Sequence, residues 1–157
     1  KRRFEHIGIR NGVTLIDDYA HHPSEVAAVL STAQSLCRPG LSRRRIWCAF
    51  QPHQVLRTRR LFDEFVAALS LADRVLVLPA FTAREADQAS AREVSRELVS
   101  HLTQLGCRAR MLTTLDHLRE TMETLTRPGD IFLTLGAGDI GRIHYEPEGR
   151  IPGHLAG

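Results

Sequence analysis

Apolar residues along the chain change their spacing several times, and each spacing predicts a type of element. Two alternating segments, Phe4 to Ile9 and Val13 to Asp17, flank Asn11-Gly12. That dipeptide tolerates positive φ and favours a two-residue β-hairpin turn. Further along, short apolar runs typical of strands alternate with segments whose apolar residues lie three and four apart, as on one face of a helix. The pattern predicts a hairpin followed by alternating helices and strands.

The alternating elements are regular enough to give approximate bounds. Strands are expected at 46–50, 75–78, 109–112 and 131–135, and helices around 23–36, 61–69, 94–105 and 115–125. Pro23 suits the first turn of its helix because proline has no N–H to leave unpaired there. Ser90 and Glu93 fit a capping box at the start of the third helix.

This order of elements predicts an open α/β sheet, because parallel neighbours need a crossover and the crossovers here are helices. We expect a mainly parallel sheet with helices on its faces and the hairpin at its N-terminus. In such sheets, ligands bind at the carboxyl ends of the strands. Polar clusters follow four strands and are expected to meet at that edge: 17–22, 51–57, 79–85 and 136–139.

Length and charge favour one domain without nucleic acid as a partner. The 157 residues, 43% of them apolar, suffice for a single core, so residues 1–157 are expected to form a single domain. The net charge is +3, but the basic residues are scattered, which does not indicate nucleic-acid binding. Only Arg43, Arg44 and Arg45 form a run, which we expect in a solvated loop.

Cysteine use and hydropathy bear on location. Cys37, Cys48 and Cys107 are widely spaced and odd in number, which favours a reduced, cytoplasmic protein. No segment approaches the roughly 20 apolar residues of a membrane span, and no signal-peptide core begins the chain, so no membrane association is expected. The chain opens with Lys1 rather than Met and is expected to be a fragment of a longer protein.

Two features bear on nucleotide binding. Gly136, Gly138 and Gly141 match G-x-G-x-x-G, but only 16 residues follow, too few for the rest of a dinucleotide unit. A tight turn at the active edge is expected there instead. Lys1 is the only lysine beside twenty arginines, so the chain contains no P-loop of the G-x-x-x-x-G-K-[ST] type. Any lysine that grips a nucleoside triphosphate has to come from another domain.

The cluster DDYAHHPSE, residues 17–25, allows two interpretations. His21 and His22 could bind zinc together with Asp18 or the distant His53, although adjacent histidines seldom converge on one ion. In the other interpretation, His22 caps the following helix while Glu25 lies in its first turn, near the positive end of the helix dipole. His21 is then left at the mouth of the helix, where it can meet an anion.

Two further pairs follow from local geometry. Asp17 and Asp18 are neighbours on a strand and point to opposite faces, so a carboxylate pair is not expected. In FQPHQVLRT, residues 50–58, Arg57 lies four residues beyond His53, and a first helical turn would bring both to the same side. A guanidinium there can hold a carboxylate or phosphate through two hydrogen bonds. The alternative for Arg57 is an ordinary surface arginine.

These motifs carry a resemblance. DDYAHHPSE, FQPHQVLRT and GAGDI, in this order and spacing, resemble the C-terminal domain of the Mur ligases, most of all the alanine-adding members. RRFEHIG and ADRVLVLPAF extend the similarity over nearly the whole chain. In that family the domain is Rossmann-like and is the third of three. The resemblance implies that an N-terminal domain for the uridine nucleotide and a central P-loop domain for ATP and Mg²⁺ precede residues 1–157 in the parent protein.

The resemblance also implies an activity. Such enzymes use ATP to phosphorylate the carboxylate of UDP-N-acetylmuramate, and the amine of L-alanine attacks the acyl phosphate to form an amide bond for peptidoglycan. By resemblance, Asp18 contacts the ATP ribose, with Tyr19 nearby. His21 is implied to be the catalytic residue, beside the transferring phosphate or the incoming amino acid. ATP and Mg²⁺ are held mainly by the central domain, so this domain alone is expected to be inactive.

The implied amino-acid site comprises His53, Gln54 and Arg57, with Arg57 pairing with the substrate carboxylate. Gln54 stands where alanine-adding ligases usually carry arginine, and PAFTARE, residues 79–85, replaces a segment that commonly carries tyrosine. No metal ligand is implied within this domain. Three alternatives stay open: a non-catalytic binding module with the same fold, a ligase for another small amino acid, and a metal hydrolase built on His21, His22 and His53.

Overall fold

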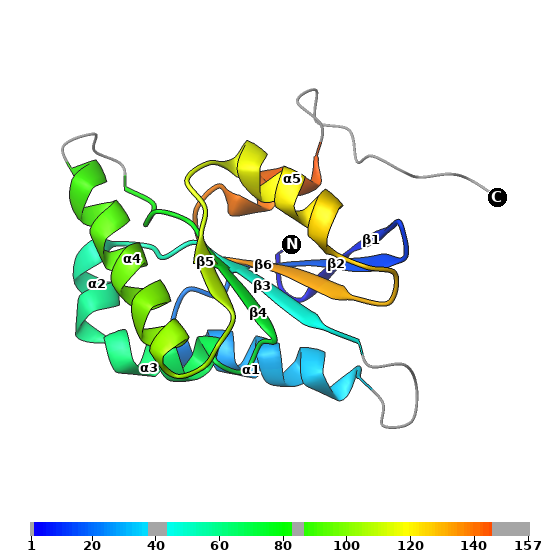
Figure 1. Cartoon of the computed structure of the whole chain (residues 1–157), viewed down its shortest axis with the longest axis horizontal. Coiled ribbons are helices and arrows are strands. Elements are labelled where there is room, and N and C mark those ends of the chain that lie inside the picture. The colour runs from blue at the N-terminus through cyan, green and yellow to red at the C-terminus, as the bar shows by residue number, and fades with distance from the viewer. Residues whose placement is uncertain (1, 38–43, 83–86, 146–157) are drawn as a thin grey trace.

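Six strands form the sheet at the centre of the protein, for which a computed structural model describes residues 2–37, 44–82 and 87–145 (Figure 1). Their order across the sheet is β1-β2-β6-β3-β4-β5. β1 pairs antiparallel with β2, and the other neighbours are parallel. The strands are Glu5–Arg10 (β1), Val13–Asp18 (β2), Ile46–Phe50 (β3), Arg74–Val77 (β4), Ala109–Met111 (β5) and Ile131–Leu135 (β6). The predicted open, mainly parallel sheet is confirmed.

The N-terminal hairpin forms as its turn sequence predicts. Asn11 and Gly12 connect β1 to β2 with φ angles of 51° and 78°. Both angles are positive, as a type I′ turn requires, and this turn matches the right-handed twist of the two strands. β2 is buried over most of its length and pairs in parallel with β6. The hairpin therefore joins the edge strand β1 to the core of the sheet.

Helices cover both faces of the sheet, as expected (Figure 1). One face carries α1 (Pro23–Ser35), α2 (Val55–Arg60), α3 (Phe62–Leu69) and α4 (Gln88–Gln104), and the other carries α5 (Leu115–Leu125) and the 3₁₀ helix η2 (Ile140–His144). Each face buries its own apolar cluster. The first contains Val26, Leu30, Phe50, Phe65 and Leu98. The second contains Trp47, Leu118, Met122, Phe132 and Ile140. Adjacent residues of a strand point to opposite faces, so β3 and β6 contribute to both clusters.

The helix expected at 61–69 is confirmed as α3, and a short helix, α2, precedes it. Leu61 leaves helical geometry, with φ −111° and ψ 28°, and separates α2 from α3. α2 begins at Val55, so His53 lies before the helix and not in its first turn, although the charge of Arg57 still acts on His53. That part of the prediction is wrong, because the sequence did not reveal where the helix starts.

The predicted capping box at the third of the expected helices is also wrong. α4 begins at Gln88, which places Ser90 inside the helix. Asp87 occupies the N-cap position and makes no capping hydrogen bond through its side chain. Glu93 instead pairs with Arg59 of α2 at 3.0 Å. The helix extends further toward its N-terminus than the apolar spacing indicated.

The arginine run was expected in a solvated loop, and this prediction is wrong for Arg45. Its guanidinium bonds both carboxylate oxygens of Asp130, at 2.6 and 3.1 Å. Asp130 also accepts the indole N–H of Trp47 at 3.0 Å. Arg44 is exposed, and Arg43 lies outside the described residues. The partner of Arg45 is distant in sequence, which is why a run of like charges did not indicate it.

All three cysteines are free thiols. Cys48 is buried in β3, and Cys37 and Cys107 are partly buried. Burial raises the pKa of the Cys48 thiol, which makes it unreactive at neutral pH. Within the described ranges, no helix has the length and apolar character to cross a bilayer.

Candidate active site at the carboxyl edge of the sheet

The loops that follow β2, β3, β4 and β6 meet at the carboxyl edge of the sheet. The N–H of Gly136, directly after β6, donates to the carbonyl of Asp18, at the end of β2, at 3.2 Å. The N–H of Phe81, after β4, donates to the carbonyl of Pro52, after β3, at 2.7 Å. The expected meeting of four polar loops is confirmed, although residues 83–86 of the third loop, including Glu85, lie outside the described residues.

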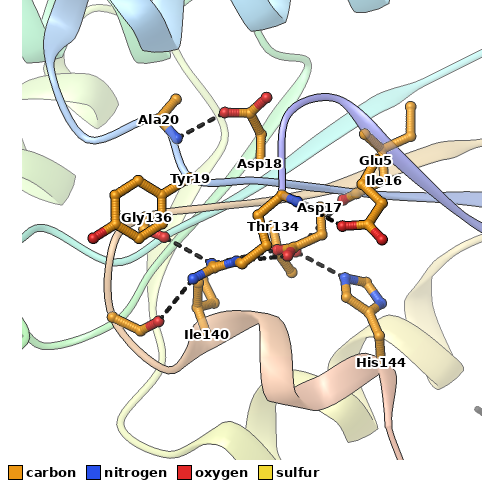
Figure 2. A network of polar contacts seen from close by, with 12 residues as sticks. Glu5, Ile16, Asp17, Asp18, Tyr19, Ala20, Thr134, Gly136, Ile140 and His144 are labelled. Carbon is orange, nitrogen blue, oxygen red and sulfur yellow. Dashed lines mark hydrogen bonds and ion pairs between the residues drawn. The ribbon is translucent and has the colours of Figure 1, made fainter.

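Asp17 and Asp18 point to opposite faces of the sheet, as expected for neighbours on a strand (Figure 2). The hydroxyl of Thr134 donates to Asp17 at 2.7 Å and lies 2.7 Å from Nε2 of His144. Arg2 donates to the other oxygen of Asp17 at 2.7 Å. Asp17 therefore belongs to a buried network below the edge, and the two aspartates form no carboxylate pair.

The hydrogen bonds fix the tautomer of His144. A carboxylate only accepts, so Thr134 gives its proton to Asp17 and must accept the Nε2–H of His144. Nδ1 is then the basic nitrogen, and it is buried with no hydrogen-bond partner in the described part of the chain. Burial lowers the pKa of His144 to about 4, although Asp17 opposes the shift. The ring is neutral at physiological pH.

Asp18 anchors the start of the DDYAHH segment. Its two carboxylate oxygens accept the backbone N–H groups of Phe4 at 2.5 Å and Ala20 at 2.7 Å. The residue is 8% exposed, and each oxygen keeps a second lone pair that can accept from a hydroxyl group. Contact with the ATP ribose stays a prediction, and the structure adds a role for Asp18 in holding the backbone.

Tyr19 and His21 project from the loop after β2. Tyr19 is 47% exposed, and the guanidinium of Arg2 lies 5.3 Å from the centroid of its ring. Nδ1 of His21 lies 3.1 Å from the carbonyl oxygen of Tyr19, which only accepts, so Nδ1 carries the proton in the neutral ring. Nε2 of His21 is then the basic nitrogen, and it makes no hydrogen bond with the described residues. This nitrogen can accept a proton from a ligand.

His22 caps α1, as one interpretation of the sequence predicts. Its Nδ1 accepts the N–H of Ser24 at 3.3 Å, and Glu25 accepts the N–H of His22 at 3.1 Å. The backbone hydrogen bond from His21, followed by that from His22, lowers the pKa of Glu25 although burial opposes it. The ring of His22 is thus occupied at the helix start. Among residues that the structure describes, no group of three or more His, Cys, Asp or Glu side chains is placed to hold a metal ion.

His53 lies between the first cluster and the loop after β4. Its ring stacks on Phe81 with centroids 6.0 Å apart and 12° between the planes, and its centroid is 6.0 Å from that of His21. Burial, followed by the charges of His21 and Arg57, lowers the pKa of His53. Arg57 makes no ion pair and no side-chain hydrogen bond with any described residue. Its guanidinium is therefore available to an anion.

Gln54 occupies the N-cap position of α2 with φ 68° and ψ 119°. Such backbone angles cost a residue other than glycine roughly 1–3 kcal/mol and are held by the surrounding structure. The carbonyl of Gln54 accepts both the N–H and the hydroxyl of Thr58, at 3.1 and 2.9 Å. Its side chain is exposed and makes no capping hydrogen bond. The side chain is therefore not engaged at the helix start, and its role in amino-acid binding stays a prediction.

The loop after β6 packs too closely on Gln51 for most side chains. A Cβ atom at Gly136 would lie 2.7 Å from the carbonyl oxygen of Gln51, and one at Gly138 would lie 2.4 Å from its Oε1. Gln51 donates to Asp139 at 3.0 Å and accepts the N–H of Ile140 at 3.2 Å. The G-x-G-x-x-G run is thus a close-packed turn at the active edge, as predicted.

A cavity of about 330 Å³ opens where the loops after β4 and β5 separate. These strands lead to α4 and α5, which lie on opposite faces, and such divergence creates a crevice in open α/β sheets. The cavity is lined by Phe81 and by polar residues that include Gln51, Arg92 and Asp139. Since Phe81 also stacks on His53, the cavity adjoins the histidine side of the site.

Three residues of the site carried no assigned role in the sequence. Gln51 lies inside a quoted motif, and its position directly after a buried strand was a usable signal. Phe81 appeared only as a departure from a family pattern, and its stacking on His53 depends on the folded loops. Arg2 lies in the opening segment, where nothing in the sequence indicates a contact with Asp17.

Comparisons with known proteins agree on one family. The family model described as Mur ligase, glutamate ligase domain, matches residues 2–138. A UDP-N-acetylmuramate–L-alanine ligase from Lachnoclostridium phytofermentans is 36% identical over 140 residues, which are 89% of this chain and 28% of the relative. One from Gloeobacter violaceus is 42% identical over 144 residues, 90% of this chain and 29% of the relative. The chain spans less than a third of the length of these relatives.

Solved structures agree on the fold. The UDP-N-acetylmuramate-alanine ligase of Thermotoga maritima superposes with a TM-score of 0.69 at 28% identity, over 90% of this chain and 28% of that one. A murein peptide ligase from Psychrobacter arcticus gives a TM-score of 0.73 at 23% identity, over 92% of this chain and 28% of that one. The second likeness concerns the fold alone.

Proposed function

This chain belongs to the Mur ligase family as a C-terminal ligase domain, and we propose that it forms the third domain of an ATP-dependent enzyme that joins L-alanine to UDP-N-acetylmuramate. The curated relatives named above carry that activity in their names, and each is more than three times as long as the aligned segment. The parent protein then contains further domains, which supply the uridine-nucleotide site and the P-loop. The product amide is a precursor of peptidoglycan, and the location is cytoplasmic.

The observation that carries this proposal is the convergence of unpaired polar groups from separate loops at the carboxyl edge. Nε2 of His21 and the guanidinium of Arg57 have no hydrogen-bonded partner among the described residues, and the rings of His21 and His53 lie 6.0 Å apart. A base beside an anion-binding guanidinium suits a substrate with both an amine and a carboxylate.

Each residue has a proposed role in that reaction. The carboxylate of Asp18 accepts hydrogen bonds from the ATP ribose, and Tyr19 packs beside the nucleotide. Nε2 of His21 accepts the proton that the amino acid's ammonium group must lose before its nitrogen attacks the acyl phosphate. Arg57 holds the carboxylate of the amino acid. His53 and Gln54 complete this pocket.

ATP and Mg²⁺ are proposed to bind mainly in the central domain. Mg²⁺ requires oxygen ligands in octahedral geometry and usually contacts the substrate phosphates. The described part of this chain offers no cluster of acidic ligands for such an ion. When bound, ATP supplies the phosphoryl group that activates the muramate carboxylate. This domain contributes contacts to the ribose and to the amino acid.

Steady-state kinetics on the parent enzyme test these roles by separating the two substrates. Losing one charge-assisted hydrogen bond costs roughly 1.5–3 kcal/mol, or about one to two decades in affinity. Asp18→Asn is expected to raise the KM for ATP by that factor, and Arg57→Lys the KM for the amino acid. Thermal unfolding of Asp18→Asn is measured as well, because Asp18 also holds the backbone of Phe4 and Ala20.

Three outcomes would contradict the proposal. If both substitutions changed only the KM for ATP, Arg57 would not hold the amino acid. If the parent with an intact P-loop formed no amide from any small amino acid, the domain would be a non-catalytic binding module. The 157-residue chain alone is expected to hydrolyse no ATP, so turnover by it that His21→Gln abolishes would overturn the three-domain account.

A further inference from the structure

Five arginines line two adjoining cavities at the amino ends of the strands, the end opposite the candidate active site. The cavities have volumes of about 360 and 460 Å³. They share four of the arginines, and the set consists of Arg45, Arg74, Arg108, Arg110 and Arg127. These residues come from the segments that begin β3, β4, β5 and β6, so only the fold brings them together.

The cluster carries more positive charge than its own carboxylates neutralise. Asp73 and Asp130 are the acidic residues that line these cavities. Asp130 is already bonded by Arg45, by Trp47 and by the backbone N–H of Arg127. The two cavities together are thus lined by five guanidinium groups and two carboxylates.

Three of the arginines have no partner of their own in the described part of the chain. Arg108, Arg110 and Arg127 are exposed, and their side chains make no ion pair or hydrogen bond with residues in the described ranges. Arg74 bonds a backbone carbonyl, that of Asp73, at 3.1 Å. Burial, then the nearby charges of Arg108 and Arg45, lower the pKa of Arg74. Like charges near one another repel, and a bound anion offsets that repulsion.

We propose that this arginine cluster binds a compact phosphate-bearing anion, such as the diphosphate group of a soluble small molecule. Guanidinium groups present forked N–H donors that match phosphate oxygens, and three such groups are unoccupied here. The cavities are concave and of the size that holds small ligands in proteins, which favours a discrete anion over a flat polyanionic surface. The site lies apart from the proposed ligase chemistry and does not depend on it.

A high arginine content alone does not account for the cluster. The chain has twenty arginines, and several, such as Arg59 and Arg119, form exposed ion pairs on helices. Surface arginines of that kind are dispersed among acidic residues. Along the two cavities, five arginines from four segments accompany two carboxylates, and Asp130 already accepts four hydrogen bonds. The arrangement is therefore a site with unfilled donors.

Trp47 provides a direct reporter for the experiment. It is the only tryptophan of the chain, it lines one of the cavities, and the guanidinium carbons of Arg45 and Arg74 lie 5.5 and 5.9 Å from its ring centroid. An anion that draws these cations toward itself changes the field at the indole. Titration of the 157-residue chain with sodium pyrophosphate, without Mg²⁺ and at constant ionic strength, is expected to change Trp47 fluorescence with saturation.

Substitutions that each remove one arginine charge, inside and outside the cluster, test where pyrophosphate binds. Arg108→Gln with Arg127→Gln is expected to weaken pyrophosphate binding about a hundredfold, because each of the two lost charge-assisted bonds is worth about one decade. Arg57→Gln, at the active edge, and Arg96→Gln, an exposed residue of α4, are expected to leave the fluorescence titration unchanged. Circular dichroism of each variant checks that it is folded.

Three results would overturn the proposal. A fluorescence change that does not saturate, or that inorganic chloride reproduces at equal ionic strength, would show general screening only. If Arg57→Gln weakened pyrophosphate binding as much as the cavity variants do, the anion would bind outside the arginine cluster or without a defined site. Tight binding to phosphatidylglycerol vesicles with no response to pyrophosphate would show that the cluster recognises an anionic lipid surface instead of a soluble diphosphate.

Discussion

Arg2 and Asp17 form an ion pair that joins the opening segment of the chain to the active edge, with Nε of Arg2 2.7 Å from the carboxylate. The same guanidinium donates to the carbonyls of Gly136 and Gly138, at 2.7 and 3.1 Å. The carbonyl of Arg2 in turn accepts the N–H of Tyr19 at 2.8 Å. Arg2 thus fixes the segment that precedes the hairpin, the loop after β2 and the loop after β6.

Replacing Arg2 by alanine is expected to destabilise the chain by about 2 kcal/mol, because Asp17 is left buried without its counter-charge. Asp17 is 2% exposed, so water replaces the lost donors poorly. Urea unfolding of the 157-residue chain measures the change. Arg3→Ala is the control, since Arg3 is exposed and next in sequence. Equal effects of the two substitutions would mean that the ion pair contributes nothing beyond loss of surface charge.

His144 is expected to make the chain less stable as the pH falls. Its pKa is about 4 in the folded chain, below the roughly 6.5 of an unfolded histidine, so the unfolded state binds a proton that the folded state does not. The free energy of unfolding then decreases from about pH 6.5 to about pH 4, by about 3 kcal/mol in total, and is unaffected above that window.

Urea unfolding at a series of pH values tests this behaviour of His144. His144→Gln keeps a donor for Thr134 but does not titrate. The slope of its unfolding free energy against pH is therefore expected to be smaller than that of the unsubstituted chain, by up to about 1.4 kcal/mol per pH unit, the equivalent of one proton. His53 and the other titrating groups are present in both proteins and cancel in the comparison. Parallel pH curves for the two proteins would show that His144 is not the titrating group.

Gly136 tests how closely the loop after β6 must approach Gln51. Gly136→Ala is expected to destabilise the chain because the new Cβ would lie 2.7 Å from a backbone oxygen and because φ is +146°. Gly8 has a similar φ of +153°, but a Cβ atom added there would meet nothing within 4 Å, so Gly8→Ala isolates the backbone strain of about 1–3 kcal/mol. If Gly136→Ala loses more thermal stability than Gly8→Ala, the difference gives the cost of the contact between the new Cβ and the Gln51 carbonyl. Equal losses for the two substitutions would argue against close packing at Gly136.

The sequence predicted the sheet because its signals are local. The Asn11-Gly12 turn and the alternation of apolar runs with helical spacing depend on neighbouring residues, and the fold follows them. Helix starts were less predictable, because Gln54 and Asp87 begin helices without a capping side chain. Their positions are set by contacts with other elements, which the local sequence does not contain.

The site was predictable in its position but only partly in its contacts. Loops at the carboxyl ends of parallel strands must share an edge, so the nearness of His21 to His53 followed from topology. The second role of Asp18, as acceptor for Phe4, depends on the path of a segment 14 residues earlier. The partner of Arg45 lies 85 residues away. Interactions over such separations become visible only once the chain is folded.

Gln54 allows the most direct test of the proposed amino-acid pocket. Glutamine can donate one hydrogen bond to a carboxylate but brings no charge and no forked pair of donors, so Arg57 must hold the substrate largely alone. In the parent enzyme, Gln54→Arg is expected to lower the KM for L-alanine by up to about tenfold, the equivalent of 1.4 kcal/mol, and to leave the KM for ATP unchanged.

Gln54→Lys is the matched control, because lysine adds the positive charge without the forked pair of donors. Kinetics with alanine, glycine and serine decide between the interpretations. Because the Gln54 side chain is exposed and makes no capping hydrogen bond, an arginine can be accommodated there without disturbing α2. Unaltered KM values for all three amino acids would remove Gln54 from the pocket and leave it as a strained residue at the helix start.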